Sequence, residues 1–203
     1  MAEKPESVSM HRIEALTDGI FAFAMTMLVL SINIPLSPSS LAGMSVGETL
    51  LGQTDRFVNY ATSFLLLAIF WVSHHRVFDH LKGVDWKLVW GNVILLLFIA
   101  LVPFSMELTN EFTKDPVADF LFGLNMFIIG TIYYLLWAYA TDHRRLVKPS
   151  LNNEHIQRTK KALLTISLIS LLSMFVAFVY PSLAPLVFLI IPILLFFPKL
   201  KSK

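Results

Sequence analysis

The stretch HRIEALTDGIFAFAMTMLVLSINIP, residues 11–35, begins with several charged side chains and continues as a mostly apolar run. The run from about 15 to 35 has the roughly 20 residues that a helix needs to cross the hydrocarbon core of a bilayer. Arg12, Glu14 and Asp18 lie at the start of this run, and no charged residue follows them within it. The stretch therefore predicts a transmembrane helix with a charged entrance.

The composition of the whole chain supports the same environment. Of its 203 residues, 56% are hydrophobic and only 15% are charged, whereas a soluble domain has about 25% charged residues. Inside a bilayer the backbone must satisfy its own hydrogen bonds, so apolar runs of this length predict helices. The chain has no cysteine, which excludes disulfides, thiolate metal sites and cysteine nucleophiles. We therefore expect an all-α membrane protein that needs no cofactor.

Five more apolar runs follow the first one. They lie at about 57–77, 88–108, 117–140, 161–180 and 183–198. Polar or proline-rich segments separate the runs, and no internal repeat is visible. Between the first two runs, Ser45 and Glu48 have the spacing of a helix capping box. The sequence predicts one domain, residues 1–203, with six transmembrane helices.

Lysine and arginine are distributed unevenly over this arrangement. If the chain crosses the membrane six times, only Arg56 and Lys114 of the 16 basic residues lie on the side opposite the two termini. Cytoplasmic loops carry the excess of basic residues in membrane proteins. We therefore expect cytoplasmic N- and C-termini and a multi-pass protein of the plasma membrane. The basic loops lack the interleaved aromatic residues of a nucleic-acid-binding surface, so no nucleic-acid partner is expected.

Polar residues of the first three helices fall at one depth in this topology. Arg12 and Asp18 stand at the entrance of the first helix, His74 and His75 near the end of the second, and Asn92 near the start of the third. Arg12 and Asp18 are about 9 Å apart along a helix and point roughly 120° apart, so they cannot pair on one regular helix. Because a desolvated carboxylate needs a partner, we expect Asp18 to pair with one of the two histidines. This polar layer either clamps helix ends together or takes part in function.

The first helix also carries a stripe of mixed side chains. The non-aliphatic residues Gly19, Thr26 and Asn33 recur every seven residues, a spacing that drifts by only about 20° per step around a helix. The stripe consists of Gly19, Phe23, Thr26, Leu30 and Asn33, with Met27 beside it. Small residues on such a stripe can let a neighbouring helix approach closely. Alternatively, the stripe faces a symmetry axis, where hydroxyl groups and apolar constrictions line a narrow path.

Three segments resemble one family of membrane proteins. RIEALTD, residues 12–18, is similar to the first-helix signature of the lysosomal potassium channel family known as transmembrane protein 175, in its prokaryotic form, with Leu16 and Thr17 in place of the signature's Phe and Ser. FWVSHHRVF, residues 70–78, resembles the end of the family's second helix, and WGNVILLLFIALVPFSMEL, residues 90–108, resembles its third. The remaining helices are similar only in topology.

This resemblance implies a homotetramer of six-helix subunits around a central pore lined by the first helix. Such a channel conducts potassium ions, with modest selectivity over sodium, and lacks a TVGYG filter, which this sequence also lacks. The family pattern places the main apolar constriction at Phe23, where Ile or Leu is usual. It places a further constriction at Leu30, beside Met27, and a polar layer linked to selectivity at Thr26. Gly19 and Asn33 complete the implied pore lining, and the implied motif network consists of Arg12, Thr17, Asp18, His74, His75 and Asn92.

Two other classes of membrane protein stay open. An acidic residue such as Asp18 suits a proton- or cation-coupled carrier, although carriers usually have inverted repeats and broken helices, which are not visible here. His75 and Asp79 have an i, i+4 spacing that can bind a metal in a membrane enzyme. No second ligand cluster lies at that depth in the sequence. We therefore expect a channel and not an enzyme.

Overall fold

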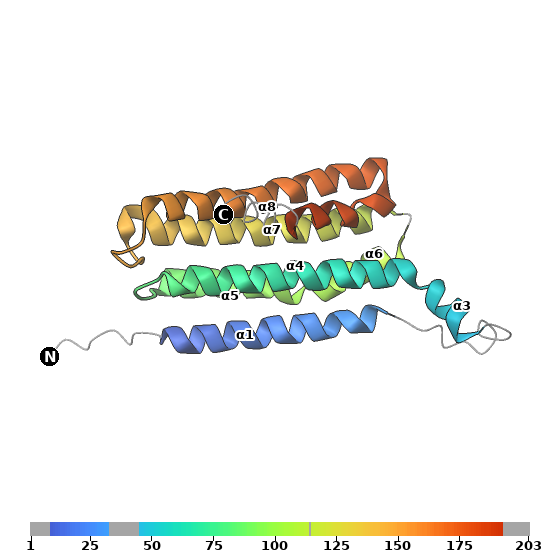
Figure 1. Cartoon of the computed structure of the whole chain (residues 1–203), viewed down its shortest axis with the longest axis horizontal. Coiled ribbons are helices and arrows are strands. Elements are labelled where there is room, and N and C mark those ends of the chain that lie inside the picture. The colour runs from blue at the N-terminus through green and yellow to red at the C-terminus, as the bar shows by residue number, and fades with distance from the viewer. Residues whose placement is uncertain (1–8, 33–44, 114, 193–203) are drawn as a thin grey trace, which may run out of the picture.

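The structure is a computed structural model that describes residues 9–32, 45–113 and 115–192. The regular elements in these residues are helices, and five helical segments are long and apolar enough to cross a membrane. They are Met10–Ser31, Thr54–Asp79, Trp86–Glu111, Pro116–Arg144 and Asn153–Val179. Figure 1 shows them as a bundle of elongated helices. The prediction of an all-α membrane protein is therefore confirmed for the described part of the chain.

The first span contains helix α1 (Met10–Met27) and a 3₁₀ segment, η1 (Leu28–Ser31). It packs against α4 (Thr54–Asp79) and against the third span. The third span is divided at Leu101 into α5 (Trp86–Ala100) and α6 (Val102–Glu111). Pro103 lacks an N–H and crowds the preceding turn, which accounts for the interruption. The fold thus places α1 at one edge of the bundle, on a layer formed by α4, α5 and α6 (Figure 1).

The fourth and fifth spans, α7 (Pro116–Thr141) and α8 (Asn153–Val179), form the other edge of the bundle (Figure 1). Glycines let the two helices approach closely. A Cβ atom at Gly130 would lie 2.9 Å from Ser167 Oγ, and one at Gly123 would lie 2.8 Å from Met174 Cγ. After α8 the chain forms the short 3₁₀ helices η3 (Pro181–Leu183) and η4 (Pro185–Leu189). The predicted run 183–198 is described only as far as residue 192.

Several helices begin at residues whose side chains bond the first free backbone N–H groups. Ser45 and Glu48 form the predicted capping box at the start of the short helix α3 (Val46–Leu51). Asp85 accepts from the Leu88 N–H at the start of α5, and Asn152 accepts from the Glu154 N–H at the start of α8. These groups satisfy donors that a helix leaves unpaired at its N-terminus.

The α4–α5 and α7–α8 loops lie together at one end of the bundle, called the basic end below. The backbone N–H of Lys82 donates to the Leu146 carbonyl, and that of Lys148 donates to the His80 carbonyl, both at 2.9 Å. Asp85 joins the α4–α5 loop to α7, because the Tyr139 hydroxyl donates a hydrogen bond to the Asp85 carboxylate. Burial acts to raise the pKa of Asp85, but the bonds from Tyr139 and from the Leu88 N–H, with nearby basic side chains, lower it below its usual range. The folded protein therefore favours the ionised form of Asp85 more than the unfolded chain does.

Candidate functional site

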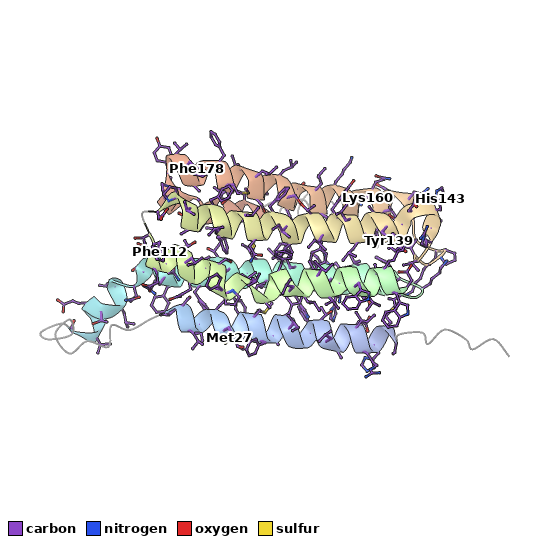
Figure 2. All side chains as sticks on the ribbon, turned by 180° about the vertical axis from the view of Figure 1, so that it is seen from behind. Met27, Phe112, Tyr139, His143, Lys160 and Phe178 are labelled. Carbon is purple, nitrogen blue, oxygen red and sulfur yellow. The ribbon has the colours of Figure 1, made fainter. Side chains whose placement is uncertain are left out.

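Helix α1 has one face buried against its own chain and one face that the rest of the chain leaves uncovered. Successive residues turn by about 100°, so residues three or four apart share a face. The buried set is Ile13, Thr17, Phe21, Ala24, Leu28 and Ser31. The uncovered set on the opposite side includes Arg12, Leu16, Gly19, Phe23, Thr26, Met27 and Leu30. Figure 2 shows Met27 at the edge of the bundle farthest from α7 and α8.

The uncovered face contains the described part of the predicted stripe. Phe23 is 63% exposed and Leu30 is 65% exposed, although both are large apolar side chains. A Cβ atom added to Gly19 would have no neighbour within 4 Å. The Thr26 hydroxyl donates to the Phe23 carbonyl at 2.8 Å, and this bond leaves both lone pairs of its oxygen available as acceptors. Asn33, the last residue of the predicted stripe, lies outside the described residues.

At the basic end, a buried chain of hydrogen bonds joins α1, α5 and α4. The Asn92 amide donates to Thr17 Oγ1 at 3.1 Å, and Asn92 Oδ1 lies 2.9 Å from His74 Nε2. All three side chains are buried. Because the Asn92 oxygen can only accept, His74 carries its proton on Nε2 in this arrangement. Three of the six residues of the predicted motif network therefore form one interhelix connection.

Asp18 belongs to a second, more exposed cluster at the same end. Its Oδ1 accepts from the Trp71 indole N–H at 2.9 Å and lies 3.9 Å from His75 Nδ1. The Trp71 and His75 rings are 4.8 Å apart between centroids. Of the two histidines offered as partners for Asp18, the structure thus brings His75 near it and turns His74 toward Asn92. Arg12 lies on the uncovered face and makes no ion pair with any residue that the structure describes.

At the opposite end, an arginine that the sequence did not single out contacts the last residue of η1, where the first span ends. Arg56 of α4 donates from Nη1 to the Ser31 carbonyl at 3.1 Å and from Nη2 to Glu111 Oε1 of α6 at 2.6 Å. A second carboxylate oxygen, Glu107 Oε1, lies 3.8 Å from Nη1. Arg56 is one of only two basic residues on the sparse side of the predicted topology, and this was the available signal.

The metal site considered for a membrane enzyme is not assembled. Across residues 9–32, 45–113 and 115–192, no group of three or more potential ligand residues is placed to hold a metal ion. His75 lies beside Trp71 and Asp18, as described above. His80 instead packs its ring against His155 of α8, with centroids 4.5 Å apart. Burial and the neighbouring His155 lower the pKa of His80.

Comparison with known proteins gives consistent matches to one family. The family model described as endosomal/lysosomal potassium channel TMEM175 matches residues 12–103, which contain most of the three similar segments. A potassium channel of Chamaesiphon minutus is 30% identical over 164 residues, covering 79% of this chain and 80% of that protein. A potassium channel of Streptomyces collinus is 30% identical over 155 residues, covering 73% of each.

A solved structure matches as well. The crystal structure of a lysosomal potassium-selective channel TMEM175 homolog from Chamaesiphon minutus has a TM-score of 0.80 and 26% sequence identity. The alignment covers 91% of this chain and 94% of that one. These relatives are ion channels and not enzymes, so the metalloenzyme alternative is set aside. The chain belongs to the TMEM175 family of potassium channels, as one of its prokaryotic members.

Proposed function

We propose that this protein is a potassium channel in which four copies of α1 surround a central pore. The observation that carries the proposal is the uncovered face of α1, which combines a glycine, a hydroxyl and large apolar side chains at one side of the subunit. Lipid contact alone would not require the glycine or the hydroxyl on that face. The potassium channels of the related bacteria support the choice of ion.

In this proposal, Thr26 forms the polar layer of the pore. Four copies would place four hydroxyl oxygens around the axis, each already oriented by its bond to the Phe23 carbonyl. A cation that has lost part of its water could be coordinated there by oxygen lone pairs. The chain has no TVGYG filter. A single hydroxyl layer gives few ligands, so we expect only modest selectivity for potassium over sodium.

Phe23 and Leu30 form the apolar constrictions, with Met27 beside them. Narrow apolar rings block ions by excluding water, so conduction requires α1 to rotate or tilt until these side chains leave the axis. The bonds of Thr17 to Asn92 and of Asp18 to Trp71 hold the basic end of α1 and bias that movement. Gly19 and Asn33 complete the lining on either side of the constrictions.

The remaining topology is also proposed. The basic end contains both connecting loops, and lysines and arginines are concentrated in and beside these loops. This concentration supports a cytoplasmic location for this end and for both termini in a plasma membrane. Residue 192, the last one described, lines a cavity of about 310 Å³ between α4 and α8 together with apolar residues such as Leu65 and Ile166. We propose that the run 183–198, which extends beyond the described residues, is the sixth crossing of the membrane.

Potassium flux from liposomes tests the proposal. Phe23→Ala removes the ring at the main constriction and should raise the flux several-fold over the wild type. Phe175→Ala is the matched control, because Phe175 is 69% exposed on the far edge of the bundle and should leave the flux unchanged. A Phe23→Ala protein that conducts no better than the wild type would contradict the assignment of the constriction. Flux that saturates at low potassium concentration would indicate a carrier.

A further inference from the structure

The end of a membrane helix leaves carbonyl groups without intrahelical partners. At the end of the first span, Ser31 of η1 is buried, and its hydroxyl donates back to the Leu28 carbonyl at 2.7 Å. The Ser31 carbonyl itself accepts from Arg56 Nη1. A guanidinium at this position satisfies the carbonyl and also complements the negative end of the helix dipole.

The position of Arg56 is fixed by a second helix. Glu111 and Glu107 of α6 face its guanidinium with separations of 2.6 and 3.8 Å. The Arg56 side chain is only 21% exposed, so solvent screens these contacts less than it screens a surface ion pair. The planar guanidinium can direct separate N–H groups to a carboxylate and to a carbonyl at once. Arg56 of α4 therefore links η1 and α6 at a single point.

We propose that Arg56 is a positioning residue that sets the rotation of η1, called the outer end of the first span below because it lies opposite the basic end, and thereby the place of Leu30 in the pore. This inference rests on the proposed function. Leu30 directly precedes Ser31, whereas the Thr17–Asn92 bond lies 14 residues away, roughly 21 Å along the helix. A backbone radius of about 2.3 Å means that a 30° rotation moves a Cα atom by roughly 1 Å. A shift of that size in four copies changes the width of a narrow apolar ring.

The chain contains no cysteine, so a single introduced cysteine can carry a spin label without background. Val29→Cys places a label on the exposed side of the outer end, and Ala22→Cys places one nearer the basic end. In the Arg56→Gln background, the label at Val29 should become more mobile, while the label at Ala22 should not change. Without labels, Arg56→Gln should raise potassium flux at least threefold.

Conservative variants separate positioning from a loss of folding. Arg56→Lys keeps the charge but lacks the planar fork that reaches the Ser31 carbonyl and the Glu111 carboxylate together, so its flux should lie between those of the wild type and of Arg56→Gln. Glu111→Gln should raise the label mobility at Val29 and the potassium flux, as Arg56→Gln does. In size-exclusion chromatography it should elute at the same volume as the wild type.

Two outcomes overturn the inference and are distinguishable from each other. Unchanged mobility at Val29 in Arg56→Gln would show that Arg56 does not hold the end of α1. Increased mobility with unchanged flux would show that this end does not control conduction. If Phe23→Ala still raises the flux, only the role of Arg56 fails. If Phe23→Ala is also silent, the proposed pore fails with it.

Discussion

The buried Asn92 makes the sharpest energetic prediction. It is 1% exposed and bonds Thr17 of α1 at 3.1 Å and His74 of α4 at 2.9 Å. Asn92→Leu keeps a similar volume but leaves both partners without a hydrogen bond inside the bundle. Interhelix hydrogen bonds in membrane proteins contribute about 0.6 kcal/mol on average and up to about 1.7 kcal/mol each. Losing two of them should therefore destabilise the subunit by about 1–3 kcal/mol.

Thermal unfolding of the purified protein in detergent measures this effect. Ile94→Leu is the control, because Ile94 is an exposed apolar residue on the same helix and should leave the midpoint unchanged. The double variant Thr17→Val with Asn92→Leu should lose less stability than the two single variants together, because each single variant already removes the Thr17–Asn92 bond. An Asn92→Leu protein with the same thermal midpoint as the wild type would refute the structural role of the buried chain of bonds.

Two further predictions concern the α7–α8 contact and the basic end. Gly130→Ala should lower the thermal midpoint, with a cost of about 1–3 kcal/mol, because the new Cβ meets Ser167. Gly19→Ala should not lower the midpoint, because its Cβ meets no atom of the same chain and alanine favours a helix over glycine. Because the pKa of Asp85 is lowered on folding, its stabilisation is present at neutral pH and is lost as the pH falls below about 4. Asp85→Asn keeps a helix-capping side chain and should lose less stability in an acid titration of unfolding than the wild type.

The spans were predictable because hydrophobicity reports directly on the membrane. The helix ends were less predictable, because a helix can continue past the apolar run into water. Helix α8 begins at Asn153, well before the predicted run at 161, because Asn152 caps polar turns that an apolar count ignores. Helix α1 likewise begins at Met10 and not near residue 15. The break at Leu101 required the tertiary fold, although Pro103 was visible in the sequence.

The candidate site was predictable only in part. The seven-residue spacing placed Gly19 and Thr26 on one face, which Phe23 shares, and the structure leaves that face uncovered. The choice between His74 and His75 was not predictable, because it depends on how α4 is rotated toward its neighbours. Arg56 was missed for the same reason, since its partners come from residues 25 and 55 positions away in the chain.

Chemical modification inside the proposed pore tests the central claim most directly. Thr26→Cys would place the only cysteine of the chain on the uncovered face of α1. Thr165→Cys is the matched control, because Thr165 of α8 also bonds a carbonyl of its own helix and lies at the other edge of the bundle. A positively charged thiol reagent should abolish potassium flux through Thr26→Cys and leave Thr165→Cys unaffected. Unchanged flux through a fully modified Thr26→Cys protein would contradict a pore lined by α1.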